Sequence, residues 1–160
     1  RYQNGEVVLY DPFENIHKNQ ILDTSKIPAN ISDKITKLSK TQAKLIAEKL
    51  DYIGTMCVEF FIDEKEKLYV NEIAPRVHNS GHLSINANSV SQFESHIRAV
   101  CNLEIIQPKV IKNAFMKNII GNEIEEYRNR NYKSNEFFYD YLKKEPKPKR
   151  KMGHLTTVEN

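Results

Sequence analysis

Apolar and polar positions follow two different periods along the first half of the chain. Between residues 31 and 50, apolar residues recur at helical spacing with lysines between them, which predicts an amphipathic helix. Residues 52–62 and 68–73 are rich in aromatic and β-branched residues, and a short charged segment separates them. That arrangement predicts a β-hairpin, which should end at Pro75 because proline cannot donate to a strand ladder.

The N-terminal residues have the pattern of a hairpin that is already half complete. A turn signal at Asn4-Gly5 precedes the apolar residues 7–10, which predicts that residues 7–10 form the second strand of a hairpin. The residues before the turn are too few to supply the first strand. We therefore expect the chain to be part of a longer protein and to be inactive by itself.

A second helix is predicted after the hairpin. Ser89 and Gln92 form a capping-box pattern, which is typical of the start of a helix. The apolar face of this helix should carry Phe93, Ile97 and Val100, because these residues recur at helical spacing. The first part of the chain therefore combines helices with an antiparallel hairpin.

Composition changes at residues 107–108, and the pattern beyond them is mostly that of strands. Residues 114–120, 136–144 and 150–158 each have a strand-like pattern. The chain is thus predicted to be α+β. Residues 1–107 would form one domain, and residues 108–160 would form a small, mostly β C-terminal domain.

Composition is that of an ordinary globular protein. The 160 residues include 39% hydrophobic and 28% charged residues, and no apolar run approaches the ~20 residues that span a bilayer. Cys57 and Cys101 lack metal-binding or redox spacing and lie in apolar stretches, which is typical of reduced thiols in a cytoplasmic protein. Membrane proteins and disulfide-rich secreted proteins are therefore disfavoured.

Positive charge is concentrated near the C-terminal end, although the net charge is only +3. Residues 143–151 contain six basic residues and one acidic residue, an excess that favours binding of a phosphate group. A solvated basic tail and a nucleic-acid-binding module are the alternatives. The strand-like residues 152–158 argue against a tail, and the lack of interleaved aromatic residues argues against nucleic acid.

Two glutamates interrupt the apolar strands of the predicted hairpin, Glu59 in the first strand and Glu72 in the second. A carboxylate in such a setting is costly unless a cation pairs with it. Mg²⁺ fits a facing pair, because it takes one or two carboxylates and fills its other positions with water and nucleotide phosphates. The alternative is that each glutamate pairs with a lysine at the sheet edge.

Polar donors are concentrated in residues 75–82, directly after the second strand. A guanidinium, two imidazoles and an amide occur in this short stretch, and Gly81 permits unusual backbone angles. Arginine matches planar anions such as carboxylate and bicarbonate through paired donors. An anion site is therefore favoured over a surface loop with incidental polar residues.

The same stretch resembles a known enzyme family. Residues 71–82, NEIAPRVHNSGH, are similar to the signature of the N5-carboxyaminoimidazole ribonucleotide synthases, also called the ATPase subunit of phosphoribosylaminoimidazole carboxylase. The similarity continues through residues 91–100 and 150–154 and, upstream, through residues 14–22, so it spans essentially the whole chain. It implies an ATP-grasp fold, truncated at its N-terminal side and followed by the small C-terminal domain.

The resemblance also implies roles for individual residues. ATP would be contacted by His17, Asn71 and Glu72, and Mg²⁺ would be held by Glu59 and Glu72. The catalytic residues, which would receive bicarbonate, are Arg76, His78 and Asn79. Lys144 and Arg150 flank a proline-containing turn, and strand pairing would bring them together to hold the phosphate of a ribonucleotide. Lys149 stands in this turn where the resemblance predicts a glycine.

The reaction implied by the resemblance is the ATP-dependent carboxylation of aminoimidazole ribonucleotide with bicarbonate in purine biosynthesis. The implied partners are the N-terminal half of the same enzyme and a second copy in a homodimer. Neither membrane nor nucleic acid is expected. Another ATP-grasp carboxylase, such as a biotin carboxylase or a formate-using purine enzyme, is the rival reading, which the run from His78 to His82 disfavours.

Overall fold

Two antiparallel sheets organise the chain, which the computed structural model describes from residue 1 to residue 159. One sheet has five strands in the order β1-β2-β5-β7-β6, and the other is the hairpin β3–β4. The elements are β1 (Glu14–Lys18), β2 (Ile21–Ile27), α1 (Asp33–Lys49), β3 (Cys57–Ile62), β4 (Leu68–Ala74), η1 (Asn79–Gly81), α2 (Ser84–Ala87), α3 (Gln92–Val100), β5 (Ala114–Ile120), α4 (Glu123–Arg128), β6 (Glu136–Asp140) and β7 (Lys151–Val158). The α+β prediction is confirmed.

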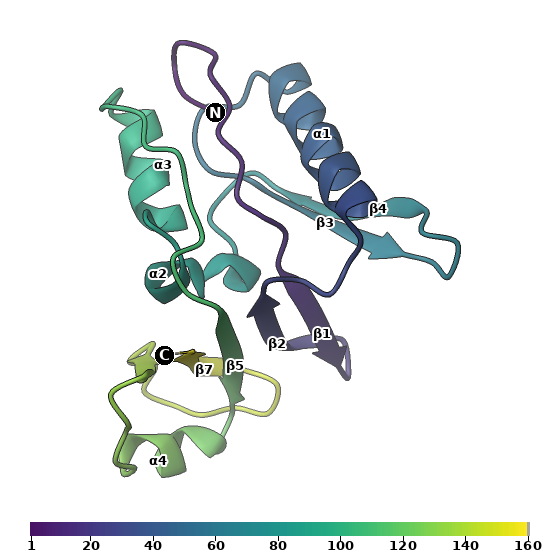
Figure 1. Ribbon diagram of the computed structural model, residues 1–160. Helices are drawn as coiled ribbons and strands as arrows, with labels where there is room; N and C mark the ends of the chain where they lie inside the picture. The colour runs from purple at the N-terminus through teal and green to yellow at the C-terminus, as the bar shows by residue number, and fades with distance from the viewer. Residues whose placement is uncertain (160) are drawn as a thin grey trace.

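The five-stranded sheet joins strands that are distant in the sequence. β2 pairs with β5, with Thr24 opposite Lys117, so the sheet crosses the predicted boundary at residue 107, and the division into two domains stays a prediction. All three predicted C-terminal strands are present, although β6 ends at Asp140 instead of continuing to residue 144. Figure 1 shows β5, β7 and α4 in the lower part of the molecule and the β3–β4 hairpin beside α1 in the upper right.

Both faces of the five-stranded sheet bury apolar side chains. Met116 and Ile119 of β5 are completely buried and point to opposite faces, because side chains alternate along a strand. One core consists of Ile27, Leu83, Ala87, Ala114, Met116 and Val158, and the other of Ile119, Ile124, Met152 and Leu155. This sheet is therefore the main hydrophobic framework of the chain.

The predicted first helix is confirmed as α1, which begins after Ser32. The Ser32 hydroxyl accepts a hydrogen bond from the Ile35 amide at 3.4 Å, so it caps the free N–H groups of the first turn. Ile35 is almost completely buried. Within residues 1–159, none of the helices is long and apolar enough to cross a membrane.

The second helix begins where the sequence predicted, but with a different cap. Ser91, not Ser89, caps α3, because its hydroxyl accepts from the Glu94 amide at 3.2 Å. The capping box is thus Ser91 with Glu94. Ser89 instead anchors a later segment, since its hydroxyl accepts from the Lys109 amide at 3.0 Å.

The predicted apolar face of α3 is not the face that the helix buries. Phe93, Ile97 and Val100 are 39%, 54% and 39% exposed, whereas the buried face carries Gln92, Ser95 and Ala99. Helical spacing identifies a stripe of apolar residues correctly, but it does not say which stripe faces the rest of the chain. Here the polar Gln92 faces inward, because it has partners there.

The N-terminal segment turns as predicted but forms no strand. The Tyr2 amide donates to the Glu6 carbonyl at 2.8 Å, and Gly5 has a φ of +89°, a conformation that glycine adopts without strain. Residues 7–10 have no ladder partner among residues 1–159. The prediction of a strand at residues 7–10 is therefore wrong for this structure.

Candidate functional site

The β3–β4 hairpin brings the two candidate metal ligands together. Glu59 and Glu72 are directly opposite in the antiparallel register, so their side chains emerge on the same face of the hairpin. Both line one cleft of about 450 Å³, whose wall consists of His17, Gln20, Ile21, Leu22, Glu59, Glu72, His78, Lys143, Lys149 and Lys151. The two glutamates thus face a shared cleft, and their role as metal ligands stays a prediction.

The two glutamates differ sharply in burial. The Glu59 side chain is 9% exposed and that of Glu72 is 48% exposed. Oε2 of Glu59 accepts from Asn71 at 3.4 Å, but Oε1 has no hydrogen-bond partner among residues 1–159. Since a buried carboxylate oxygen without a donor is costly, the carboxylate pair fits a hard divalent cation such as Mg²⁺. Within residues 1–159, neither glutamate forms an ion pair with a lysine.

His78 lies between the two carboxylates. Its Nδ1 is 3.5 Å from Oε1 of Glu59, and its Nε2 is 4.0 Å from Oε1 of Glu72. Burial lowers the pKa of His78 below its ordinary value, although the carboxylates of Glu59 and Glu72 act in the opposite direction. The ring is therefore mainly neutral at neutral pH, and it can offer a lone pair.

The other two predicted bicarbonate residues point to different surroundings. Arg76 is exposed, donates to the Val77 carbonyl at 3.1 Å and lies 3.9 Å from Oε1 of Glu72. Asn79 instead donates to Oδ1 of Asn118 on β5 at 3.0 Å, and its own Oδ1 is buried without a hydrogen-bond partner among residues 1–159. Arg76 and His78 thus meet at Glu72, while Asn79 contacts the five-stranded sheet.

Gln92 fixes the loop that carries His78, and sequence reasoning had given it only a capping role. Its Oε1 accepts from the His78 amide at 2.9 Å, and its Nε2 donates to the His78 carbonyl at 2.7 Å. The same Nε2 lies 2.8 Å from Nδ1 of His82. A Cβ on Gly81 would lie 2.6 Å from Oε1 of Gln92, so a larger residue at position 81 would displace this clamp.

Histidine and tyrosine rings form a buried layer behind this loop. His154 stacks on Tyr139 with ring centroids 4.6 Å apart, and its Nδ1 lies 2.9 Å from the Tyr141 hydroxyl. Burial lowers the pKa of His154 to about 3 and that of His82 to about 4. His154 is 2% exposed, so its ring packs inside the fold.

The basic segment contributes to the same cleft through residues other than the two predicted ones. Lys143, Lys149 and Lys151 line the cleft, and burial lowers the pKa of Lys151 despite the nearby Glu59 carboxylate. Lys144 and Arg150 are exposed and lie outside this lining. Their binding of a ribonucleotide phosphate stays a prediction.

A second cavity adjoins the glutamate cleft. It measures about 460 Å³, lies between residues 1–17, α1 and β3, and shares His17, Glu59 and His78 with the cleft. Asn71 lines this second cavity as well. Of the two residues predicted to contact ATP beside Glu72, His17 thus lines both cavities, whereas Asn71 lines only the second one.

Two protein-family models match separate parts of the chain. Residues 1–93 match the model of the ATP-grasp domain, and residues 114–160 match that of the phosphoribosylaminoimidazole carboxylase C-terminal domain. Among curated proteins, the chain is 40% identical over 159 residues to N5-carboxyaminoimidazole ribonucleotide synthase of Brucella melitensis, covering 99% of this chain and 44% of that protein. It is 43% identical over 162 residues to the synthase of Staphylococcus aureus, covering 100% of this chain and 43% of that protein.

Solved structures agree with these sequence matches. The S. aureus N5-carboxyaminoimidazole synthetase complexed with ADP superposes with a TM-score of 0.90 at 41% identity, covering all of this chain and 44% of that chain. The Aspergillus clavatus synthase in complex with ADP and 5-aminoimidazole ribonucleotide superposes with a TM-score of 0.89 at 31% identity, covering 99% and 44%. The chain therefore spans less than half the length of the relatives that it matches.

Proposed function

Because the chain belongs to the ATP-grasp family, we propose that it is the C-terminal part of an N5-carboxyaminoimidazole ribonucleotide synthase. The complete enzyme would carboxylate 5-aminoimidazole ribonucleotide with bicarbonate and release ADP and phosphate. The observation that carries this proposal is the cleft in which Glu59 and Glu72 face each other beside His78, within a chain that is 40% identical to such synthases. Purine biosynthesis in the cytoplasm is the setting that this reaction implies.

Glu59 and Glu72 would hold Mg²⁺, which supplies positive charge to the phosphates of ATP when it is bound. Asn71 orients the buried Glu59 carboxylate through its 3.4 Å hydrogen bond. His17 lines both cavities from β1 and would contact ATP. The lysines at positions 143, 149 and 151 would add positive charge on the opposite wall.

Arg76, His78 and Asn79 would receive bicarbonate. A guanidinium offers paired donors that match the planar anion, and neutral His78 would accept or donate one hydrogen bond without adding charge. Gln92 clamps the His78 backbone on both sides, so the loop is held in place before a substrate arrives. Such prior order lowers the cost of orienting reactants.

Lys144 and Arg150 would bind the phosphate of the ribonucleotide, outside the glutamate cleft. The side-chain direction alternates between Arg150 and Lys151, which agrees with Lys151 lining the cleft while Arg150 does not. A homodimer of the complete enzyme belongs to the same proposal. Nucleic acid binding does not, because the lysines of the cleft face a pair of glutamates.

The decisive experiment is Glu72→Gln in the complete enzyme. Removing the charge while keeping the shape should lower MgATP turnover by about 100-fold or more, because the stabilisation of the phosphate charge depends on it. Glu64→Gln is the matched control, since Glu64 lies exposed in the connection between β3 and β4. Near-normal turnover of Glu72→Gln would overturn the metal assignment.

The two basic groups can be separated by steady-state kinetics. Arg150→Ala should raise the KM for the ribonucleotide about tenfold or more, because a charge-assisted contact contributes roughly 1.5–3 kcal/mol. Lys151→Ala should instead raise the KM for MgATP, because Lys151 shares the cleft with Glu59 and Glu72. If Arg150→Ala raised the KM for MgATP and Lys151→Ala raised the KM for the ribonucleotide, the two basic groups would have been assigned to the wrong phosphates.

A further inference from the structure

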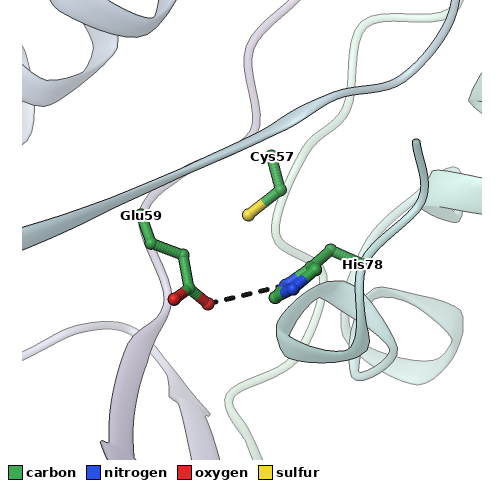
Figure 2. Close-up of side chains that lie close together, drawn as sticks. All are labelled: Cys57, Glu59 and His78. Carbon is green, nitrogen blue, oxygen red and sulfur yellow. Dashed lines mark ion pairs between the residues drawn. The ribbon is translucent and has the colours of Figure 1, made fainter. Parts of the chain in front are cut away.

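Three potential metal ligands of different chemical type meet at the inner end of the cleft. Cys57 and Glu59 are two residues apart on β3, so both side chains emerge on one face, and His78 approaches from the loop after β4. Figure 2 shows the Cys57 sulfur, the Glu59 carboxylate and the His78 ring directed toward a common space. One ligand atom from each residue lies within 4.8 Å of the other two.

We propose that Cys57, Glu59 and His78 form a binding site for a thiolate-preferring divalent cation such as Zn²⁺. The set shares only Glu59 with the Glu59–Glu72 pair assigned to Mg²⁺. A thiolate, an imidazole and a carboxylate are the ligand types that zinc takes in proteins, whereas Mg²⁺ binds oxygen ligands. The combination of sulfur and nitrogen therefore selects a different cation from the facing carboxylates.

The spacing of the ligand atoms fits tetrahedral zinc. With bonds of about 2.0–2.2 Å, a nitrogen and an oxygen ligand lie about 3.4 Å apart across a tetrahedral angle. Nδ1 of His78 and Oε1 of Glu59 are 3.5 Å apart. A sulfur ligand at about 2.3 Å from zinc lies about 3.6 Å from each of the others. The sulfur of Cys57 lies within 4.8 Å of both, so each of these two distances has to shorten by at most about 1.2 Å.

The oxygen that would bind the ion is the one without a partner. Oε1 of Glu59 is buried and forms no hydrogen bond within residues 1–159, and its side chain is only 9% exposed. A cation at this point removes the cost of that buried acceptor. The buried Glu59 carboxylate therefore favours a bound cation whether or not the Cys57 sulfur also binds it.

The Ser80 hydroxyl marks the space between the other two ligands. Its Oγ lies 2.8 Å from Nδ1 of His78 and 3.7 Å from the sulfur of Cys57. An ion bound by both residues replaces these two contacts. The fourth position of the tetrahedron then falls to water or to the displaced hydroxyl, as in zinc sites with three protein ligands.

Cobalt binding to the 160-residue chain tests the site without any turnover. Co²⁺ titrated into the reduced wild-type chain should give a one-to-one thiolate-to-cobalt charge-transfer band, which Zn²⁺ abolishes and excess Mg²⁺ does not. Cys57→Ser should lose the band. Cys101→Ser is the matched control and should keep it, because the exposed Cys101 lies at the end of α3.

The histidine ligand is tested in the same titration. His78→Ala should weaken Co²⁺ binding about tenfold or more, whereas His17→Ala, which removes another histidine of the cleft wall, should leave it unchanged. A wild-type chain without the band, a band that survives in Cys57→Ser, or equal losses in both histidine variants would each overturn the proposal.

A second experiment rests on the proposed function. An ion held by these ligands occupies Glu59 and His78, so Zn²⁺ should inhibit the complete enzyme. Inhibition is measured as the ratio of the turnover rates with and without Zn²⁺. This ratio should return toward one in Cys57→Ser but not in Cys101→Ser. Cobalt binding without inhibition would overturn the assignment of Glu59 and His78 to turnover while leaving the metal site intact. Inhibition that is equal in both cysteine variants would show that zinc acts elsewhere.

Discussion

The two sheets of the chain differ in the share of their residues that is buried. β7 is buried along nearly its whole length, whereas β4 buries only Ala74. Phe61, Val70 and Ile73 of the hairpin are 61%, 48% and 41% exposed. The five-stranded sheet therefore supplies most of the stability of this chain, while the hairpin and the segment directly after it supply most of its candidate chemistry.

This difference follows from the number of strands that share a core. An isolated two-stranded hairpin is only marginally stable, whereas a sheet of three or more strands with an apolar face can stand by itself. The hairpin carries Glu59 and Glu72, and carboxylates on its face reduce the apolar area that it can bury. The candidate catalytic and metal-binding groups thus lie on the less buried of the two regions, which also leaves them accessible.

The largest effect should come from truncating the core of the larger sheet. Ile119→Ala removes a completely buried side chain and should lower the free energy of unfolding by about 2–5 kcal/mol. Val70→Ala in the hairpin is the matched control, and it should cost less than about 1 kcal/mol because Val70 is 48% exposed. Urea unfolding measures both, and equal losses would contradict the comparison.

The loop after the hairpin is held by Gln92, whose side chain is almost completely buried. Gln92→Met keeps the volume but leaves the amide and carbonyl of His78 without their partners, which should lower the free energy of unfolding by about 1–3 kcal/mol. Gln42→Met on α1 is the control and should be nearly neutral, since no hydrogen bond of its side chain occurs within residues 1–159. Amide hydrogen exchange at His78 should accelerate in the first variant only; if it does not, the clamp is not what orders this loop.

Local sequence patterns predicted the elements much better than their contacts. The helix at α1 and the hairpin at β3–β4 were foreseeable, because each follows from the period of apolar residues within one segment. The pairing of β2 with β5 joins residues about ninety positions apart, and no local pattern encodes it. Nor does a local pattern show that α3 buries Gln92 and not its apolar face, since the partners of Gln92 lie in the loop that carries His78.

In the candidate site, too, local features were predictable from the sequence and contacts between distant segments were not. The facing of Glu59 and Glu72 was predictable, because a hairpin fixes the register of its two strands. The role of Cys57 beside them was not, since its spacing to His78 matches no short metal motif and depends on how the loop after β4 folds back. Likewise, the sequence placed positive charge near the C-terminal end, but only the fold shows that Lys151 faces Glu59 and Glu72.

The buried histidine of the larger sheet should make its stability depend on pH. The pKa of His154 is lowered from 6.5 to about 3 by burial. The unfolded chain therefore binds a proton that the folded chain excludes, and stability is lost as the pH falls from about 6.5 toward 3. In His154→Asn or His154→Phe, the slope of the unfolding free energy between pH 4.5 and 5.5 should decrease by about 1.4 kcal/mol per pH unit. An unchanged slope in a folded variant would show that His154 is protonated in the native state.

The smallest effect concerns the turn between β6 and β7 of the larger sheet, where Lys149 stands in place of the predicted glycine. Lys149 has a φ of +66°, a left-handed conformation that costs a residue with a Cβ about 1–2 kcal/mol and costs glycine nothing. Glycine also gains freedom in the unfolded chain, worth about 0.4–1 kcal/mol, so Lys149→Gly should raise the free energy of unfolding by a net ~0.5 kcal/mol.

Lys147→Gly in the same turn is the control for this substitution. Residue 147 is not among the residues with positive φ, so a glycine there gives no relief of strain and should lower the free energy of unfolding by about 0.5–1 kcal/mol. The two variants lose the same charge from the same exposed turn. The ion pair of Lys147 with Glu145, 3.8 Å long and exposed, contributes little to stability, so the main difference between the variants is the backbone conformation. Urea unfolding should therefore show opposite signs. If both substitutions destabilise the chain equally, the left-handed conformation at Lys149 carries no strain, and this turn tolerates lysine as well as glycine.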